Sequence, residues 1–158
     1  MDLQALRANR MPPEAKLLGA GGVIPLLAGA VMVSAVREPF GIPLIYPVLV
    51  YAAMILSFLG GIHWGFALAA LARKGVELKA PRLLGLSVLP ALAAWVAALL
   101  PPAYAAPFLA VGFAAVLLLD RKSDQLGYAP SWWMPLRFRL TMAVVTLLSL
   151  ISIVEISR

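Results

Sequence analysis

The chain has 158 residues, of which 63% are hydrophobic and 13% are charged, and its mean hydropathy is +0.94. Soluble domains carry about 25% charged residues, so this composition excludes an ordinary soluble enzyme. The absence of cysteine excludes disulfides, thiolate nucleophiles and cysteine-ligated metals. The long uncharged runs instead predict a single integral membrane domain over residues 1–158.

The uncharged runs divide into five predicted membrane spans. A helix that crosses the hydrocarbon core needs about 20 apolar residues. The run 83–119 is too long for one crossing, and Pro101 and Pro102 divide it because proline breaks a helix. The predicted fold is therefore all-α, a polytopic helix bundle with transmembrane helices over residues 17–36, 43–72, 83–100, 102–119 and 136–157.

The first predicted helix leaves two questions open. Basic residues ahead of it and the small residues 28–30 near its end resemble a signal peptide, although the run is longer than a typical signal core. Its segment V-I-P-L-L-A, residues 23–28, matches V-L-P-A-L-A at residues 88–93. The match favours either a parallel repeat of helical hairpins, helices 1–2 and 3–4 plus a closing fifth helix, or the common use of these residue types in membranes.

The second predicted helix carries a packing signal and a polar one. Small residues recur every four positions and predict close approach of another helix: Ala53, Ser57, Gly61, Gly65 and Ala69. The chain's single histidine, His63, lies on the opposite side of this helix and forms a candidate polar site with Trp64. It precedes Arg73 by about 15 Å of helix, which predicts a position near the middle of the membrane.

An ionisable residue inside a membrane is a candidate functional group, and the alternative for His63 is a neutral imidazole that bonds a hydroxyl or a carbonyl. One histidine without cysteine supplies too few ligands for a metal or haem, so no cofactor is predicted. We expect Asp120 and Asp124 on the inner surface, in solvated pairs with Arg121 and Lys122. Recognisable hydrolase, phosphate-loop and zinc motifs are absent, which predicts a protein that is not an enzyme.

Charge predicts the orientation and the lipid contacts. All but two of the 13 Lys and Arg residues fall on one predicted face, and only Arg37 and Arg158 fall on the other. The positive-inside rule therefore predicts a cytoplasmic N-terminus and an external C-terminus. The basic groups should attract anionic lipid headgroups rather than nucleic acid, because topology already explains their place. The predicted interfacial anchors are Tyr46, Tyr104, Trp132, Trp133, Arg137 and Arg139.

Three segments resemble a known family: L-S-F-L-G-G-I-H-W-G at 56–65, S-V-L-P-A-L-A-A-W at 87–95 and P-S-W-W-M-P-L-R-F-R-L-T at 130–141. They are similar to an uncharacterised bacterial membrane family, a domain of unknown function, that includes mitochondrial transmembrane protein 69. The resemblance implies a small multi-pass protein of the bacterial inner membrane. It brings no established activity, cofactor or catalytic residue.

Two functional hypotheses follow. In the first, the chain is a non-enzymatic accessory or assembly factor whose small-residue stripe packs against helices of other membrane proteins or of a second copy. In the second, it is a carrier or channel for a proton or a small solute, with His63 in the path. Few polar residues occur in the first, third and fourth predicted helices. A water-filled path needs such residues, so the sequence favours the accessory role.

Overall fold

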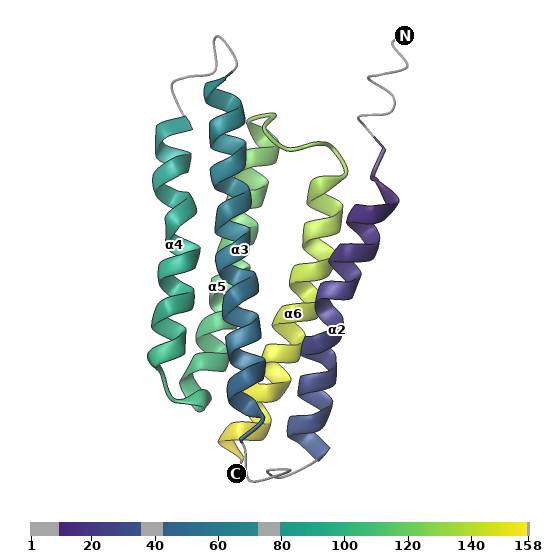
Figure 1. Ribbon diagram of the computed structural model, residues 1–158, viewed down its shortest axis with the longest axis vertical. Coiled ribbons are helices and arrows are strands. Elements are labelled where there is room, and N and C mark those ends of the chain that lie inside the picture. The colour runs from purple at the N-terminus through teal and green to yellow at the C-terminus, as the bar shows by residue number, and fades with distance from the viewer. Residues whose placement is uncertain (1–9, 36–42, 73–79, 158) are drawn as a thin grey trace.

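The computed structural model describes residues 10–35, 43–72 and 80–157, and these residues form five long helices (Figure 1). The helices are α2 (Pro13–Ala35), α3 (Ile45–Leu71), α4 (Ala80–Leu99), α5 (Pro102–Gln125) and α6 (Trp133–Ile156). Each is long and apolar enough to cross a membrane. The prediction of an all-α bundle with five spans is therefore confirmed.

The helices run alternately up and down the bundle. Figure 1 shows α3 in front of α5, α4 on one side, and α6 with α2 on the other. The most extensive pairings are α3 with α4 and α5 with α6. The predicted hairpins of a parallel repeat correspond to α2–α3 and α4–α5, which are the two least extensive of the six helix pairings. The extent of these pairings does not test whether the hairpins are related, so the repeat stays a prediction.

Glycine permits close packing at three places in the bundle. A Cβ atom added to Gly60 would overlap the backbone carbonyl oxygen of Ser87 on α4. Gly29 lies in the same way against Val48 of α3, and Gly112 of α5 lies against Leu56. The tight contact between α3 and α4 thus depends on Gly60, which is adjacent in sequence to the predicted stripe but is not part of it.

The outer surface of the bundle is apolar. Exposed large side chains occur on every helix and include Leu18, Phe58, Trp95, Val111 and Ile153. Exposed apolar area on this scale is unfavourable in water and is expected of a surface that faces lipid. The chain is therefore a multi-pass membrane protein. Within residues 10–35, 43–72 and 80–157, the exposed basic side chains gather at the end where α2, α4 and α6 begin, as the predicted clustering on one face requires: Arg10, Lys16, Arg82, Arg121, Lys122 and Arg139.

The end of α5 differs from the prediction in a way that matters for the site. The apolar run ends at Leu119, yet the helix continues to Gln125. It ends in a Schellman motif, in which Tyr128 N–H donates to the Ser123 carbonyl at 2.9 Å and Gly127 N–H donates to the Asp124 carbonyl at 2.9 Å. Gly127 has a φ of 69°, the left-handed conformation that this motif requires. The extra helical turns place Asp120 and Ser123 inside the bundle.

Candidate functional site: a buried polar network

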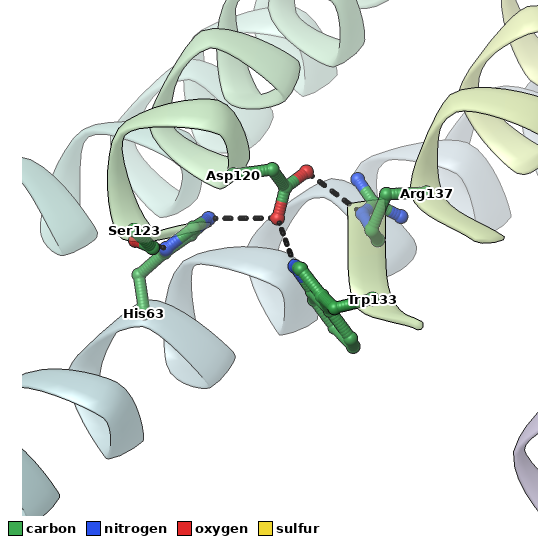
Figure 2. A network of polar contacts seen from close by, with 5 residues as sticks. All are labelled: His63, Asp120, Ser123, Trp133 and Arg137. Atoms are coloured by element: carbon green, nitrogen blue, oxygen red, sulfur yellow. Dashed lines mark hydrogen bonds and ion pairs between the residues drawn. The ribbon is translucent and has the colours of Figure 1, made fainter. Parts of the chain in front are cut away.

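Asp120 is the centre of a buried polar network that joins three helices (Figure 2). Its side chain is 1% exposed, and both carboxylate oxygens are engaged. The Oδ2 atom accepts a hydrogen bond from Arg137 Nε at 2.8 Å, and the Oδ1 atom accepts one from Trp133 Nε1 at 2.9 Å. Arg137 and Trp133 are four residues apart on α6, so both side chains lie on one face of that helix. These two donors, one on each carboxylate oxygen, compensate the negative charge of Asp120, which would otherwise be costly to bury.

His63 of α3 bridges two residues of α5. Its Nδ1 atom lies 3.2 Å from Ser123 Oγ, and its Nε2 atom lies 3.3 Å from Asp120 Oδ1. The distance between Nε2 and Asp120 Oδ1 is that of an ion pair, but the geometry of the contact is not that of a hydrogen bond. With a neutral ring, Nε2–H faces the carboxylate and Nδ1 accepts from the serine hydroxyl; with a charged ring, both nitrogens donate. The two ring nitrogens of His63 therefore connect α3 to both Ser123 and Asp120 of α5.

Aromatic rings surround the network. Phe66 packs edge-on against His63, with ring centroids 5.9 Å apart, and against Trp133 at 5.4 Å. Trp132 packs against Trp133 at 6.1 Å, and the Arg137 guanidinium carbon lies 5.8 Å from the centre of the Trp133 ring. These rings exclude water, and a low local dielectric strengthens the ionic contacts that they enclose.

The network lies toward the basic end of the bundle rather than at its middle. Asp120 is five residues from the end of α5, and Trp133 is the first residue of α6. His63 is level with both because it contacts Asp120, and α3 continues only eight residues beyond it. That distance is about 12 Å of helix. The depth of His63 in the membrane stays a prediction, because the ends of the helices do not by themselves mark the membrane surfaces.

The structure separates the two residues of the predicted polar site. His63 is 1% exposed and lies in the network, whereas Trp64 is 45% exposed on the outer surface. The tryptophan that contacts the network is Trp133, which was predicted as an interfacial anchor. Trp64 was therefore wrongly paired with His63: consecutive helical residues point about 100° apart, and only one of the two faces the bundle.

The predicted packing stripe divides along its length. Ala53 is buried and Ser57 is half-buried, but Gly61, Gly65 and Ala69 are exposed. A Cβ atom added to Gly61 or Gly65 would meet no described atom within 4 Å. The stripe therefore does not pack against the described helices of this chain at its two glycines, and its role as a contact surface for another molecule stays a prediction. His63 and this surface lie on opposite sides of α3, as expected.

The predicted anchors have different environments. Arg137 is 5% exposed and bonded to Asp120, so the expectation that it reaches the membrane surface is wrong. The structural reason is that Asp120, also expected at the surface, is buried and needs a counter-charge. Trp132 and Trp133 are half-buried. Tyr46, Tyr104 and Arg139 are exposed near helix ends, so their role as anchors stays a prediction.

Sequence reasoning missed Asp120 and Ser123 because it stopped the helix at the first charge. A spacing signal was nevertheless present. Asp120 and Ser123 are three residues apart, and Trp133 and Arg137 are four apart, which places each pair on one helix face. One pair, Trp133 and Arg137, supplies hydrogen-bond donors for the buried carboxylate of Asp120. The other pair places Asp120 and Ser123 beside the two ring nitrogens of His63.

Comparison with known proteins now identifies the family. A family model described as "Protein of unknown function (DUF3429)" matches residues 11–153. The chain belongs to this family. It is also 33% identical over 148 residues to Transmembrane protein 69 of Xenopus tropicalis. The match covers 91% of the chain and 54% of that relative, so the chain spans about half the relative's length. No solved structure matches the chain.

The network's chemistry is that of charge pairing and hydrogen bonding. Arg137 and Asp120 neutralise each other, and His63 Nε2 lies 3.3 Å from the same carboxylate. Within the described ranges, no group of three or more His, Cys, Asp or Glu side chains is placed to hold a metal ion. In this network Arg137 and Trp133 already donate hydrogen bonds to the two carboxylate oxygens of Asp120. The arrangement is therefore suited to fixing three helices together.

Proposed function

We propose that this chain is a non-enzymatic integral membrane protein, an accessory or assembly factor, that binds a partner transmembrane helix on the outward face of α3. The observation that carries the proposal is the exposed pair Gly61 and Gly65, where added Cβ atoms would meet no described atom within 4 Å. Two glycines four residues apart let another helix approach closely in lipid. The partner therefore binds the face of α3 at Gly61 and Gly65, which the other described helices leave uncovered.

Two further features support this surface. Large apolar side chains flank the glycines and could pack around a second helix: Met54, Phe58, Trp64 and Leu68. Glycine inside a helix also costs roughly 1 kcal/mol relative to alanine, and at Gly61 and Gly65 no contact within the described chain offsets that cost. A contact outside the chain would offset it. The partner is a helix of another membrane protein or of a second copy of this chain.

The test is copurification from native membranes followed by mass spectrometry and a measurement of oligomeric state. Gly61→Leu and Gly65→Leu should lose the partner that the unchanged protein retains. Gly85→Leu is the matched control, since Gly85 is an exposed glycine on α4 with equally open surroundings. Thermal stability of the isolated protein should be unchanged or higher in all three variants, because leucine favours the helix more than glycine does. Equal partner recovery by all three would overturn the proposal.

The site of action that we propose is the bacterial inner membrane, with the basic end of the bundle and the N-terminus in the cytoplasm. The exposed cations at that end support this orientation, because cytoplasmic loops carry an excess of Lys and Arg. The same cations would bind anionic headgroups of the inner leaflet, at about 1 kcal/mol for each cation near the surface.

A proton carrier is the second candidate, and the buried His63–Asp120 contact of 3.3 Å favours it. The layers beyond the network weigh against it. Past Thr141, the buried residues of α6 are Val144, Leu148, Ile151 and a single polar one, Ser152, and those of α5 toward the same end, which include Phe113, Leu109 and Ala106, are all apolar. A water-filled path would need polar groups in these layers.

Measurement of proton flux in reconstituted vesicles separates the two candidates. For an accessory protein, no flux should depend on His63, and His63→Leu should lower thermal stability more than His63→Gln, because leucine removes the side-chain partner of Ser123 and one of the contacts of Asp120. Loss of a pH-dependent flux in a stable His63→Gln protein would instead establish the carrier.

A further inference from the structure

Two cavities lie between α4 and α5, one after the other along the two helices. The first has a volume of about 330 Å³ and lies at the basic end of the bundle, and its described lining residues are Arg82, Leu83, Leu86, Lys122, Gln125 and Leu126. The second has a volume of about 280 Å³ and lies farther from that end. Its described lining residues are all apolar and include Leu89 and Ala93 of α4 and Ala115 and Leu119 of α5.

The two cavities lie on the same face of each helix. Residues three or four positions apart share one face of an α-helix. Lining residues of the two cavities follow one another with these spacings along α4: Arg82, Leu86, Leu89 and Ala93. The same spacings occur along α5: Ala115, Leu119, Lys122 and Leu126. The cavities therefore form a single α4–α5 furrow, which is charged at the basic end of the bundle and apolar beyond it.

The charged part of the furrow has the electrostatics of an anion site. Arg82 and Lys122 are its cations, and no acidic residue is among its described lining residues. Neither cation forms an ion pair with a described residue. Arg82 also lies in the first turn of α4, where the helix dipole disfavours a positive charge. An anion between the two side chains would offset their mutual repulsion and the effect of the dipole on Arg82.

The apolar part of the furrow indicates which anion. From Arg82 to Ala93 the helix advances eleven residues, or about 16 Å. The hydrocarbon core is about 30 Å thick, so this length corresponds to one leaflet. The apolar part also opens to lipid, because Leu89 and Leu118 in its lining are 52% and 69% exposed. A phosphate group suits Arg and Lys side chains, and a phosphate joined to a hydrocarbon chain of leaflet length is a phospholipid.

We propose that the α4–α5 furrow binds one anionic phospholipid molecule, with the phosphate between Arg82 and Lys122 and one acyl chain along the apolar part. Gln125 adds an amide donor beside the phosphate. A zwitterionic headgroup suits the furrow less well, because its ammonium group would lie near two cations. The inference rests on the proposed contacts of the exposed cations with anionic headgroups, and it is independent of the partner surface of α3.

The test counts the lipid molecules bound to the full-length protein by native mass spectrometry, after release from a nonionic detergent. The probes are dioleoyl phosphatidylglycerol, which is anionic, and dioleoyl phosphatidylcholine, which is zwitterionic and has the same chains. One phosphatidylglycerol molecule should bind saturably and about tenfold more tightly than phosphatidylcholine. Equal affinity for the two lipids would overturn the proposal. Displacement of the lipid by glycerol 3-phosphate would assign the charged cavity to a soluble phosphate compound and would also overturn it.

A pair of double variants with the same net charge separates a site from general attraction. Arg82→Gln with Lys122→Gln should weaken phosphatidylglycerol binding by about tenfold or more. Arg121→Gln with Arg139→Gln is the control, because these exposed cations lie at the same end but are not among the described lining residues of the furrow. Equal weakening by both double variants would overturn the furrow and leave the general headgroup contacts in place. No weakening by either would contradict both.

A second pair of variants locates the acyl chain. Ala115→Phe places a ring in the apolar part of the furrow and should weaken phosphatidylglycerol binding by about fivefold, with thermal stability unchanged. Ala114→Phe is the control, because Ala114 is an equally exposed neighbour on α5 that lines a different cavity. If the lipid binds Ala115→Phe as tightly as Ala114→Phe, the chain lies elsewhere and the proposed site is wrong.

Discussion

Removal of either charge from the Asp120–Arg137 pair should destabilise the bundle more than removal of both. The two side chains are 1% and 6% exposed, and Asp120 Oδ2 lies 2.8 Å from Arg137 Nε. Breaking a buried ion pair on one side costs about 3–5 kcal/mol, because the remaining charge stays buried without compensation. Asp120→Asn and Arg137→Met should each lower the melting temperature by roughly 10 °C.

The double variant provides the decisive comparison. Asp120→Asn with Arg137→Met leaves no uncompensated charge, so its loss should be smaller than the sum of the single losses by at least about 2 kcal/mol. Unfolding in a mild detergent, followed by tryptophan fluorescence, measures all three variants. Arg139→Met is the control, since Arg139 is exposed on the same helix and should change stability by less than about 0.5 kcal/mol. A double variant whose loss of stability equals the sum of the two single losses would refute the reasoning. An Arg137→Met variant as stable as Arg139→Met would also refute it.

Two further predictions concern the turn and the topology. Gly127→Ala should lower the free energy of unfolding by about 1 kcal/mol, because alanine is strained at a φ of 69°; an unchanged melting temperature would contradict the role of the Schellman motif. Because the chain has no native cysteine, single cysteines at Arg10 and Gln125 should react with an impermeant thiol reagent from the cytoplasm, and ones at Ala103 and Ser157 from outside. Labelling of a cysteine at position 125 from outside would contradict the predicted orientation.

The sequence was sufficient for the architecture because membrane spans are local features. Uncharged length defines each helix, and Pro101 with Pro102 separates α4 from α5 where the structure separates them. The gathering of the exposed cations at one end of the bundle could be predicted in the same way, although the burial of Arg137 could not. Each of these features depends on a short stretch of chain, so none requires knowledge of which helices are neighbours.

The site could not be predicted in the same way because it depends on packing between helices. Asp120 has the sequence context of a surface residue, beside Arg121 and Lys122, and only the contact of α5 with α3 and α6 makes it a buried one. The same limit applies to glycine. Gly60 and Gly61 are neighbours in sequence, yet Gly60 packs against α4 and Gly61 faces outward, and the two cannot be distinguished without the position of α4.

The most direct test of the buried network is ¹⁵N NMR of the protein labelled at histidine. His63 is the single histidine of the chain, so every ring-nitrogen signal reports on this site. The structure predicts two distinct ring signals, of which Ser123→Ala shifts mainly Nδ1 and Asp120→Asn shifts mainly Nε2. Ring signals that match free imidazole in bulk solvent and respond to neither substitution would contradict the network.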